Sequence, residues 1–78
     1  MPVLRLFGPA REAAGTSRAD VAGHDVDAVL AGAAVRFGPA FAEVVTVSRV
    51  WVNGESVGPG HHLAPGDEVA VLPPVSGG

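Results

Sequence analysis

The sequence predicts an α+β domain in which one main helix packs on one face of a mixed sheet of four to five strands. An apolar stripe with helical spacing runs through residues 26–37. Short apolar runs at residues 3–7, 47–52 and 68–72 are typical of strands. A helix with one apolar stripe must bury it against another element, so the pattern predicts two layers around one core.

Length and composition restrict the class of protein. A chain of 78 residues allows one domain with a thin core, because so short a chain buries only about 60% of its unfolded surface. It contains no cysteine, which excludes disulfides and thiol nucleophiles. The net charge of −3 disfavours nucleic-acid binding. The apolar runs are too short to cross a membrane and the first residues do not resemble a signal peptide, so we expect a cytoplasmic protein.

The first quarter of the chain predicts a hairpin. The strand at residues 3–7 ends at Gly8-Pro9. Residues 10–14 suffice for one helical turn, which Gly15 closes. A weaker strand at residues 17–22 then pairs back on the first strand.

The clearest helix follows this hairpin. Asp25 is a favourable N-cap and Asp27 lies in the first turn, where the helix dipole favours negative charge. Arg36 lies near the opposite end, and Gly38 followed by proline ends the helix. The apolar stripe consists of Val26, Val29, Leu30, Ala33 and Phe37.

The second half predicts the remaining strands. Residues 39–45 form a turn or short helix before the strand at 47–52. Asn53-Gly54 predicts a two-residue hairpin turn, because a type I′ turn needs positive φ at both central positions. Residues 55–57 give a short return strand, and residues 68–72 give the last strand.

Alternation along the strands separates core positions from exposed ones. The predicted core consists of Leu4, Leu6, Val29, Leu30, Phe37, Val50, Val52, Val69 and Val71. Phe7, Trp51 and Leu72 point to the other face of the sheet, which no predicted element covers. Large apolar residues on an uncovered face mark a partner surface.

The last six residues, 73–78, predict a flexible arm that completes a single domain spanning residues 1–78. Pro73 and Pro74 end the last strand, because proline cannot donate to the sheet and favours an extended chain. Six extended residues reach roughly 20 Å. Gly77 and Gly78 carry no side chains, so the terminal carboxylate can reach into a channel too narrow for a Cβ atom.

Several segments together resemble a known family. They are residues 7–15 (Phe-Gly-Pro-Ala-Arg-Glu-Ala-Ala-Gly), the Asn53-Gly54 turn, residues 63–69 (Leu-Ala-Pro-Gly-Asp-Glu-Val) and the Pro-Pro-Val-Ser-Gly-Gly ending. The whole chain resembles the MoaD/ThiS family of ubiquitin-like sulfur carriers, and within it the small subunits of molybdopterin synthase. The chain departs from that pattern in its alanine-rich helix and at Ser56, where an apolar residue is common.

The resemblance implies a β-grasp fold and a mechanism. A ubiquitin-activating-like adenylyltransferase would use ATP to adenylate the carboxylate of Gly78, and a sulfur donor would convert it to a thiocarboxylate. The loaded arm, with Gly77 and Gly78 as its reacting end, would enter the large subunit of molybdopterin synthase in a heterotetramer. This chain itself would bind no cofactor and no metal.

The resemblance and the apolar positions together define a predicted partner-binding set: Phe7, Arg11, Trp51, Leu72, Pro73, Pro74, Val75 and Ser76. For Arg11 the alternative is a solvated surface charge. His61-His62 is a weak metal candidate, since adjacent histidines on an extended chain point apart. Asp67-Glu68 is better explained by turn chemistry than by acid–base catalysis.

Two other functions stay open. The chain could supply sulfur for another product, such as the thiamine thiazole or cysteine, or it could be a ubiquitin-like protein modifier. The approach through Pro73-Pro74-Val75 favours molybdopterin. The lack of lysine argues weakly against a modifier that builds chains of itself.

Overall fold

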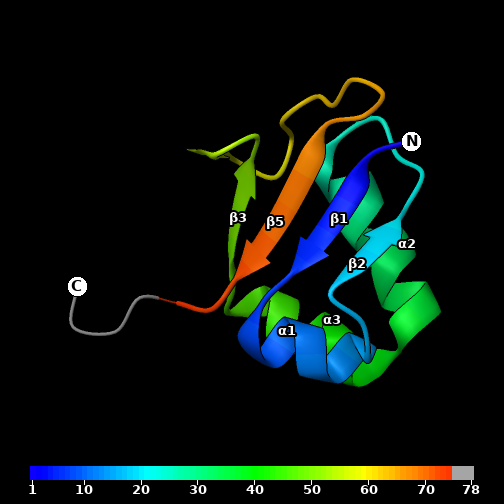
Figure 1. Ribbon diagram of the computed structural model, residues 1–78, viewed down its shortest axis with the longest axis vertical. Helices are drawn as coiled ribbons and strands as arrows, with labels where there is room; N and C mark the ends of the chain where they lie inside the picture. Colours follow the sequence, from blue (N-terminus) through cyan, green and yellow to red (C-terminus); the bar gives the residue numbers. More distant parts are fainter. Residues whose placement is uncertain (75–78) are drawn as a thin grey trace.

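The computed structural model describes residues 1–74, which form a five-stranded mixed sheet and three helices (Figure 1). The strands are β1 (Val3–Leu6), β2 (Arg18–Asp20), β3 (Arg49–Val52), β4 (Glu55–Ser56) and β5 (Glu68–Leu72). The helices are α1 (Gly8–Ala14), α2 (Val26–Phe37) and α3 (Pro39–Thr46). The predicted class, one main helix on a mixed sheet, is confirmed.

The sheet order is β2-β1-β5-β3-β4, so the last strand lies at the centre. Strand β5 pairs in parallel with β1 and antiparallel with β3. The predicted hairpins β1–β2 and β3–β4 are both present and antiparallel. The first and last strands of the chain therefore lie side by side, and β5 is hydrogen-bonded on both sides.

Local sequence signals explain the ends of the first two helices. Helix α1 has proline in its first turn and ends at Gly15, which has a left-handed φ of 76°. The carboxylate of Asp25 accepts a hydrogen bond of 2.8 Å from the Ala28 amide and caps α2, as its sequence predicts.

The core lies between the sheet and the helices, which Figure 1 shows behind the strands and at their lower end. Six predicted core residues are fully buried: Leu4, Leu6, Val29, Val52, Val69 and Val71. Leu30, Phe37 and Val50, also predicted as core, pack against this cluster and are partly buried. The sequence analysis did not include Phe41, which is completely buried and meets Phe37 edge-on at 5.3 Å between ring centroids.

The helix α3 that carries Phe41 also shortens the strand after it. The amides of Val47 and Ser48 donate to the carbonyls of Val44 and Val45, so they close the helix instead of joining β3. Strand β2 is likewise shorter than residues 17–22, and Phe7 lies outside β1, at the residue before α1. The turn prediction is confirmed, with φ of 49° at Asn53 and 84° at Gly54. Within residues 1–74, no helix has the length and apolar character needed to cross a membrane.

Candidate functional site: the open face and the end of strand β5

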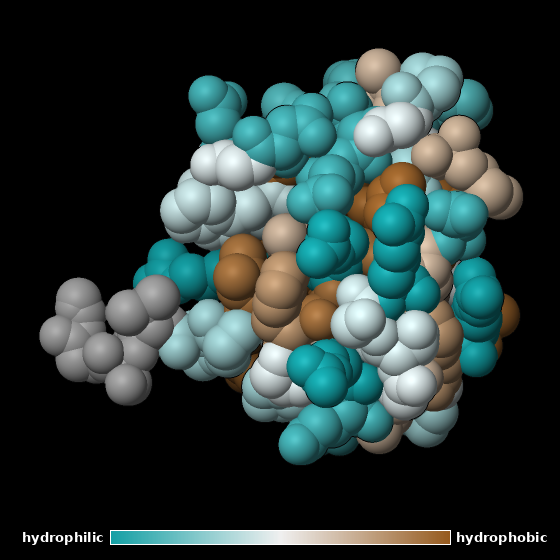
Figure 2. All heavy atoms as spheres, viewed as in Figure 1, coloured by the Kyte–Doolittle hydropathy of each residue, from teal (hydrophilic) through white to brown (hydrophobic). Residues whose placement is uncertain are grey.

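One face of the sheet, here called the open face, is not covered by any helix of residues 1–74. Cross-strand pairing places Arg5 and Trp51 on either side of Ala70, and Arg49 beside Leu72. Figure 2 views this face and shows hydrophobic surface between hydrophilic side chains. Trp51 is 40% exposed, which is unusual for a large aromatic residue and is the exposure predicted from the alternation in β3.

A groove lies on the open face where β5 ends. It has a volume of about 410 Å³ and is lined by Arg49, Trp51, Leu72, Pro73 and Pro74. It brings together four residues of the predicted partner-binding set and adds Arg49, which the sequence analysis missed. The alternation of side chains along a strand could have predicted this position, since Arg49 and Trp51 lie two residues apart on β3 and therefore share a face.

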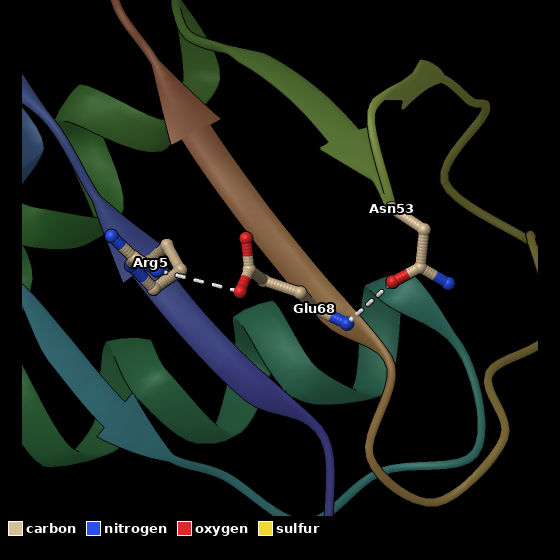
Figure 3. A network of polar contacts seen from close by, with 3 residues as sticks. All are labelled: Arg5, Asn53 and Glu68. Atoms are coloured by element: carbon tan, nitrogen blue, oxygen red, sulfur yellow. Dashed lines mark hydrogen bonds and ion pairs between the residues drawn. The ribbon is translucent and has the colours of Figure 1, made fainter.

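Phe7 lies on the other side of β5, beside Arg5. The Arg5 guanidinium carbon is 6.0 Å from the centre of the Phe7 ring, within the range of a cation–π contact. The same guanidinium donates to the Glu68 carboxylate at 3.4 Å (Figure 3). Both side chains of this ion pair are about half exposed, so it contributes little to stability. Phe7 is 40% exposed but does not line the groove, so the structure separates it from the four predicted residues that do.

At the far end of β5, a hydrogen-bond network fixes the turn that leads into the strand. The Asn53 side-chain oxygen accepts from the Glu68 amide at 3.0 Å (Figure 3). The Asp67 carboxylate accepts from the Ala64 amide at 2.8 Å and from the Asn53 side-chain nitrogen at 3.0 Å. These bonds, chiefly the one from Ala64, lower the pKa of Asp67 below its usual value. The Asp67-Glu68 pair therefore has a structural role, as its turn chemistry predicted.

The other predicted residues take separate positions. Arg11 is exposed on α1, and its docking role stays a prediction. Pro73 and Pro74 are exposed directly after β5. Val75, Ser76, Gly77 and Gly78 lie outside the described residues. His61 and His62 are exposed, and residues 1–74 contain no group of three or more acidic or histidine side chains that could hold a metal ion.

Comparison with known proteins assigns the chain to a family. The model of the ThiS family matches residues 4–78. The chain belongs to the ThiS family. The predicted resemblance to ubiquitin-like sulfur carriers is thereby confirmed. No curated protein sequence matches this ThiS-family chain.

Solved structures similar to this ThiS-family chain share its β-grasp fold. SAMP1 from Haloferax volcanii is 34% identical with a TM-score of 0.78, and the alignment covers 99% of this chain and 98% of that one. A putative molybdopterin converting factor subunit 1 from Pyrococcus furiosus is 25% identical with a TM-score of 0.80, over 95% and 97% of the two chains. Subunit 1 of the Helicobacter pylori molybdopterin-converting factor, solved in complex with subunit 2, is 23% identical with a TM-score of 0.72, over 99% and 97%. This last likeness shows the fold alone.

Proposed function

We propose that the protein carries sulfur as a thiocarboxylate on Gly78 and donates it, as the small subunit of molybdopterin synthase, for molybdopterin synthesis. Membership of the ThiS family supports the carrier part of this proposal. The likeness to the Pyrococcus furiosus protein supports the molybdopterin part.

The observation that carries the proposal is the position of the C-terminal end of β5. The central strand of the sheet leads directly into Pro73-Pro74 and then to the sequence Gly77-Gly78. The apolar groove formed by Arg49, Trp51 and Leu72 lies at the same point. A partner that covers the groove is therefore well placed to receive the arm. The docking surface would lie at the end of β5, and the reacting carboxylate would lie beyond it on Gly78.

The chemistry requires activation of a poor acyl donor. A carboxylate lacks a good leaving group, whereas an acyl-adenylate releases AMP. A partner adenylyltransferase would join the Gly78 carboxylate to the AMP part of ATP and release pyrophosphate. A sulfur donor would then attack the acyl carbon and displace AMP, which leaves sulfur in place of one carboxylate oxygen. Because this sequence needs ATP, we expect the protein to act in the cytoplasm.

Two partner proteins follow from this proposal. The adenylyltransferase and the synthase large subunit would both bind the partner-binding set defined above. The likeness to the Pyrococcus furiosus protein, which is named a putative subunit 1 of a molybdopterin converting factor, supports a partner of the second kind. We expect a heterotetramer of two small and two large subunits. ATP would bind the activating enzyme and not this chain.

Mass spectrometry tests the carrier function directly. The purified chain, incubated with the activating enzyme, ATP and a sulfur donor, should gain the mass of one oxygen replaced by sulfur, located at Gly78. Deletion of Gly78, or addition of any residue after it, should abolish the gain. Gly77→Val should lower the loading rate on the order of a hundredfold, because a β-branched side chain stiffens and widens the arm.

Gly58→Val is the matched control for Gly77→Val. A Cβ atom at Gly58 would meet no other atom within 4 Å, so this variant should load like the natural chain. Normal thiocarboxylate formation in the chain without Gly78 would contradict the proposal.

A protein modifier is the second candidate, because the chain is 34% identical to SAMP1, which is named a small archaeal modifier protein. A modifier would transfer its carboxyl terminus to an amine of another protein and form an amide bond. The two functions differ in the product of the loaded chain. A carrier gives its sulfur to a molybdopterin precursor held by the large subunit and regains its carboxylate by reaction of the acyl carbon with water, whereas a modifier stays attached to its target.

A further inference from the structure

We infer that Arg49 makes the groove at the end of β5 selective for an acidic protein surface, on which a carboxylate lies beside an apolar side chain. The apolar side chain would pack against Trp51 and Leu72, and the carboxylate would pair with Arg49. This inference deepens the proposed function, because it states the chemistry of the partner. It rests on that function for the measurement with the large subunit, but not for the measurement with peptides.

The groove combines apolar walls with a single charge. Its walls are Trp51, Leu72 and the two prolines that follow, and Arg49 is the one charged residue among the described residues that line it. Both Arg49 and Trp51 are exposed to a partner. Tryptophan and arginine are enriched in the hot spots of protein interfaces. A guanidinium can also pair with a carboxylate through two parallel hydrogen bonds, so the groove suits an apolar anchor with an acidic neighbour.

Arg49 is available for this pairing. Within residues 1–74 its side chain makes no hydrogen bond and no ion pair, unlike two other arginines of the chain. Arg5 donates to the Glu68 carboxylate at 3.4 Å, and Arg36 donates to the Asp20 carbonyl at 3.1 Å. A partner carboxylate can therefore reach Arg49 without breaking a bond of the described residues.

The charge of the open face changes sign along β5. At the start of the strand, Asp20 and Glu68 both pair with Val3, so two carboxylates lie in one row. At the end, Arg49 pairs with Leu72. The five residues of β5 span about 13 Å, since a strand rises about 3.3 Å per residue. This distance exceeds the Debye length of about 8 Å at physiological ionic strength, so the acidic row does not neutralise the field at Arg49.

The change of sign also orients the partner. The chain carries a formal net charge of −3, so an acidic surface is favoured only where a local positive charge meets it. A partner carboxylate over Arg49 lies at the end of β5, where the arm begins. The reversed orientation would place the same carboxylate against Asp20 and Glu68, and like charges brought together across an interface disfavour that arrangement.

Arg18 offers a matched control on the same face. It is exposed on β2, and the burial of Ala19 next to it places Arg18 on the open face. The strand order separates β2 from β3 by three strand spacings, or about 14 Å. Arg18→Glu and Arg49→Glu therefore change the charge of the face equally, and only the second changes the groove.

The fluorescence of Trp51, the only tryptophan of the chain, tests the inference on the isolated protein. The probe is the peptide acetyl-Glu-Glu-Leu-Glu-Glu-amide, and the control probe has Gln in place of each Glu. We expect the acidic peptide to shift the emission maximum at low salt and the Gln peptide to bind about fivefold more weakly or less. Arg49→Glu should abolish the shift and Arg18→Glu should preserve it. Arg49→Lys should keep part of the affinity, because it retains the charge and loses the planar fork.

The large subunit of molybdopterin synthase gives the second measurement. Arg49→Glu should weaken its binding by about tenfold or more at low salt, because the substitution places like charges together. The same variant should unfold at the same urea concentration as the natural chain, because Arg49 is exposed.

Three outcomes of the peptide titration would overturn the inference. They are equal affinities for the two peptides, an equal loss in the Arg18 and Arg49 variants, and no change of Trp51 emission with the acidic peptide. Emission that changes with protein concentration in the absence of peptide would assign the groove to a second copy of the chain and would also overturn it. Failure of the natural chain to load sulfur would overturn the proposed function instead, and the peptide titration would still decide the role of Arg49.

Discussion

Neighbouring residues of strand β5 belong to opposite surfaces with opposite roles. Val69 and Val71 face the helices and are completely buried, whereas Ala70 and Leu72 lie on the open face and are only partly buried. Both sets of side chains belong to one strand, which pairs with β1 from Glu68 to Val71 and with β3 from Val69 to Leu72. One strand therefore contributes to the core through one face and leaves its other face, the proposed partner surface, partly exposed.

The largest expected effect lies on the covered face. Phe41→Ala should lower the free energy of unfolding by about 3–5 kcal/mol, because a completely buried aromatic ring leaves a cavity. Urea unfolding measures this loss. Val35→Ala is the control, as Val35 is 88% exposed on α2, and its effect should stay within about 0.5 kcal/mol. A loss below about 1 kcal/mol for Phe41→Ala would mean that α3 does not close the core.

A pair of adjacent variants tests the contrast within β5 itself. Val71→Ala should cost about 2–3 kcal/mol of unfolding free energy, through lost burial and a cavity, and leave partner affinity unchanged. Leu72→Ala should cost about 1 kcal/mol or less but weaken binding of the synthase large subunit by about tenfold or more, because Leu72 lines the groove. Calorimetric titration and urea unfolding of both variants measure the two quantities. Similar profiles for the two variants would remove the distinction between the faces.

A substitution in the turn before β5 should destabilise the strand as a whole, because the turn anchors the backbone that both faces share. Asp67→Asn offers one side-chain oxygen where the carboxylate offers two, so it loses one of the bonds from Ala64 and Asn53. The variant should be less stable than the natural chain at pH 7. The folded-state pKa of Asp67 lies below its usual value of 3.8, so the stability that its carboxylate contributes is present above pH 3.8 and is lost as the pH falls through the folded-state pKa.

Unfolding free energies measured from pH 7 down to pH 2 should therefore converge for Asp67→Asn and the natural chain. A constant difference across this range would show that the carboxylate charge is not responsible.

The smallest expected effect is that of Arg11, which lies outside both the core and the groove. Arg11→Glu should weaken partner binding a few-fold at low salt and leave the melting temperature unchanged, because the side chain is exposed. Arg18→Glu makes the same charge change at an exposed position of β2 and should leave the affinity unchanged. Identical affinities for both variants would return Arg11 to the role of a solvated surface charge.

Local signals in the sequence determined much of the fold. The bounds of β5 and α2, the cap at Asp25 and the turn at Asn53-Gly54 all follow from residues within a few positions of one another. Hydrogen bonding and φ preferences at caps and tight turns depend on neighbouring residues, so sequence alone predicts them well. The exposure of Phe7 and Trp51 followed in the same way, from the period of two along a strand.

The tertiary structure alone decided which distant residues meet. The burial of Phe41, the partial exposure of Leu30 and the place of Arg49 in the groove depend on packing between separate elements. The position of Pro73 near the turn at Gly8 depends on the parallel pairing of the first and last strands. Register and packing are set by contacts between residues far apart in the chain, and the period of a single segment carries no information about its partner. The sequence thus determined where the arm begins, at Pro73, and the arrangement of the strands decided that Arg49 and Trp51 of β3 lie beside it.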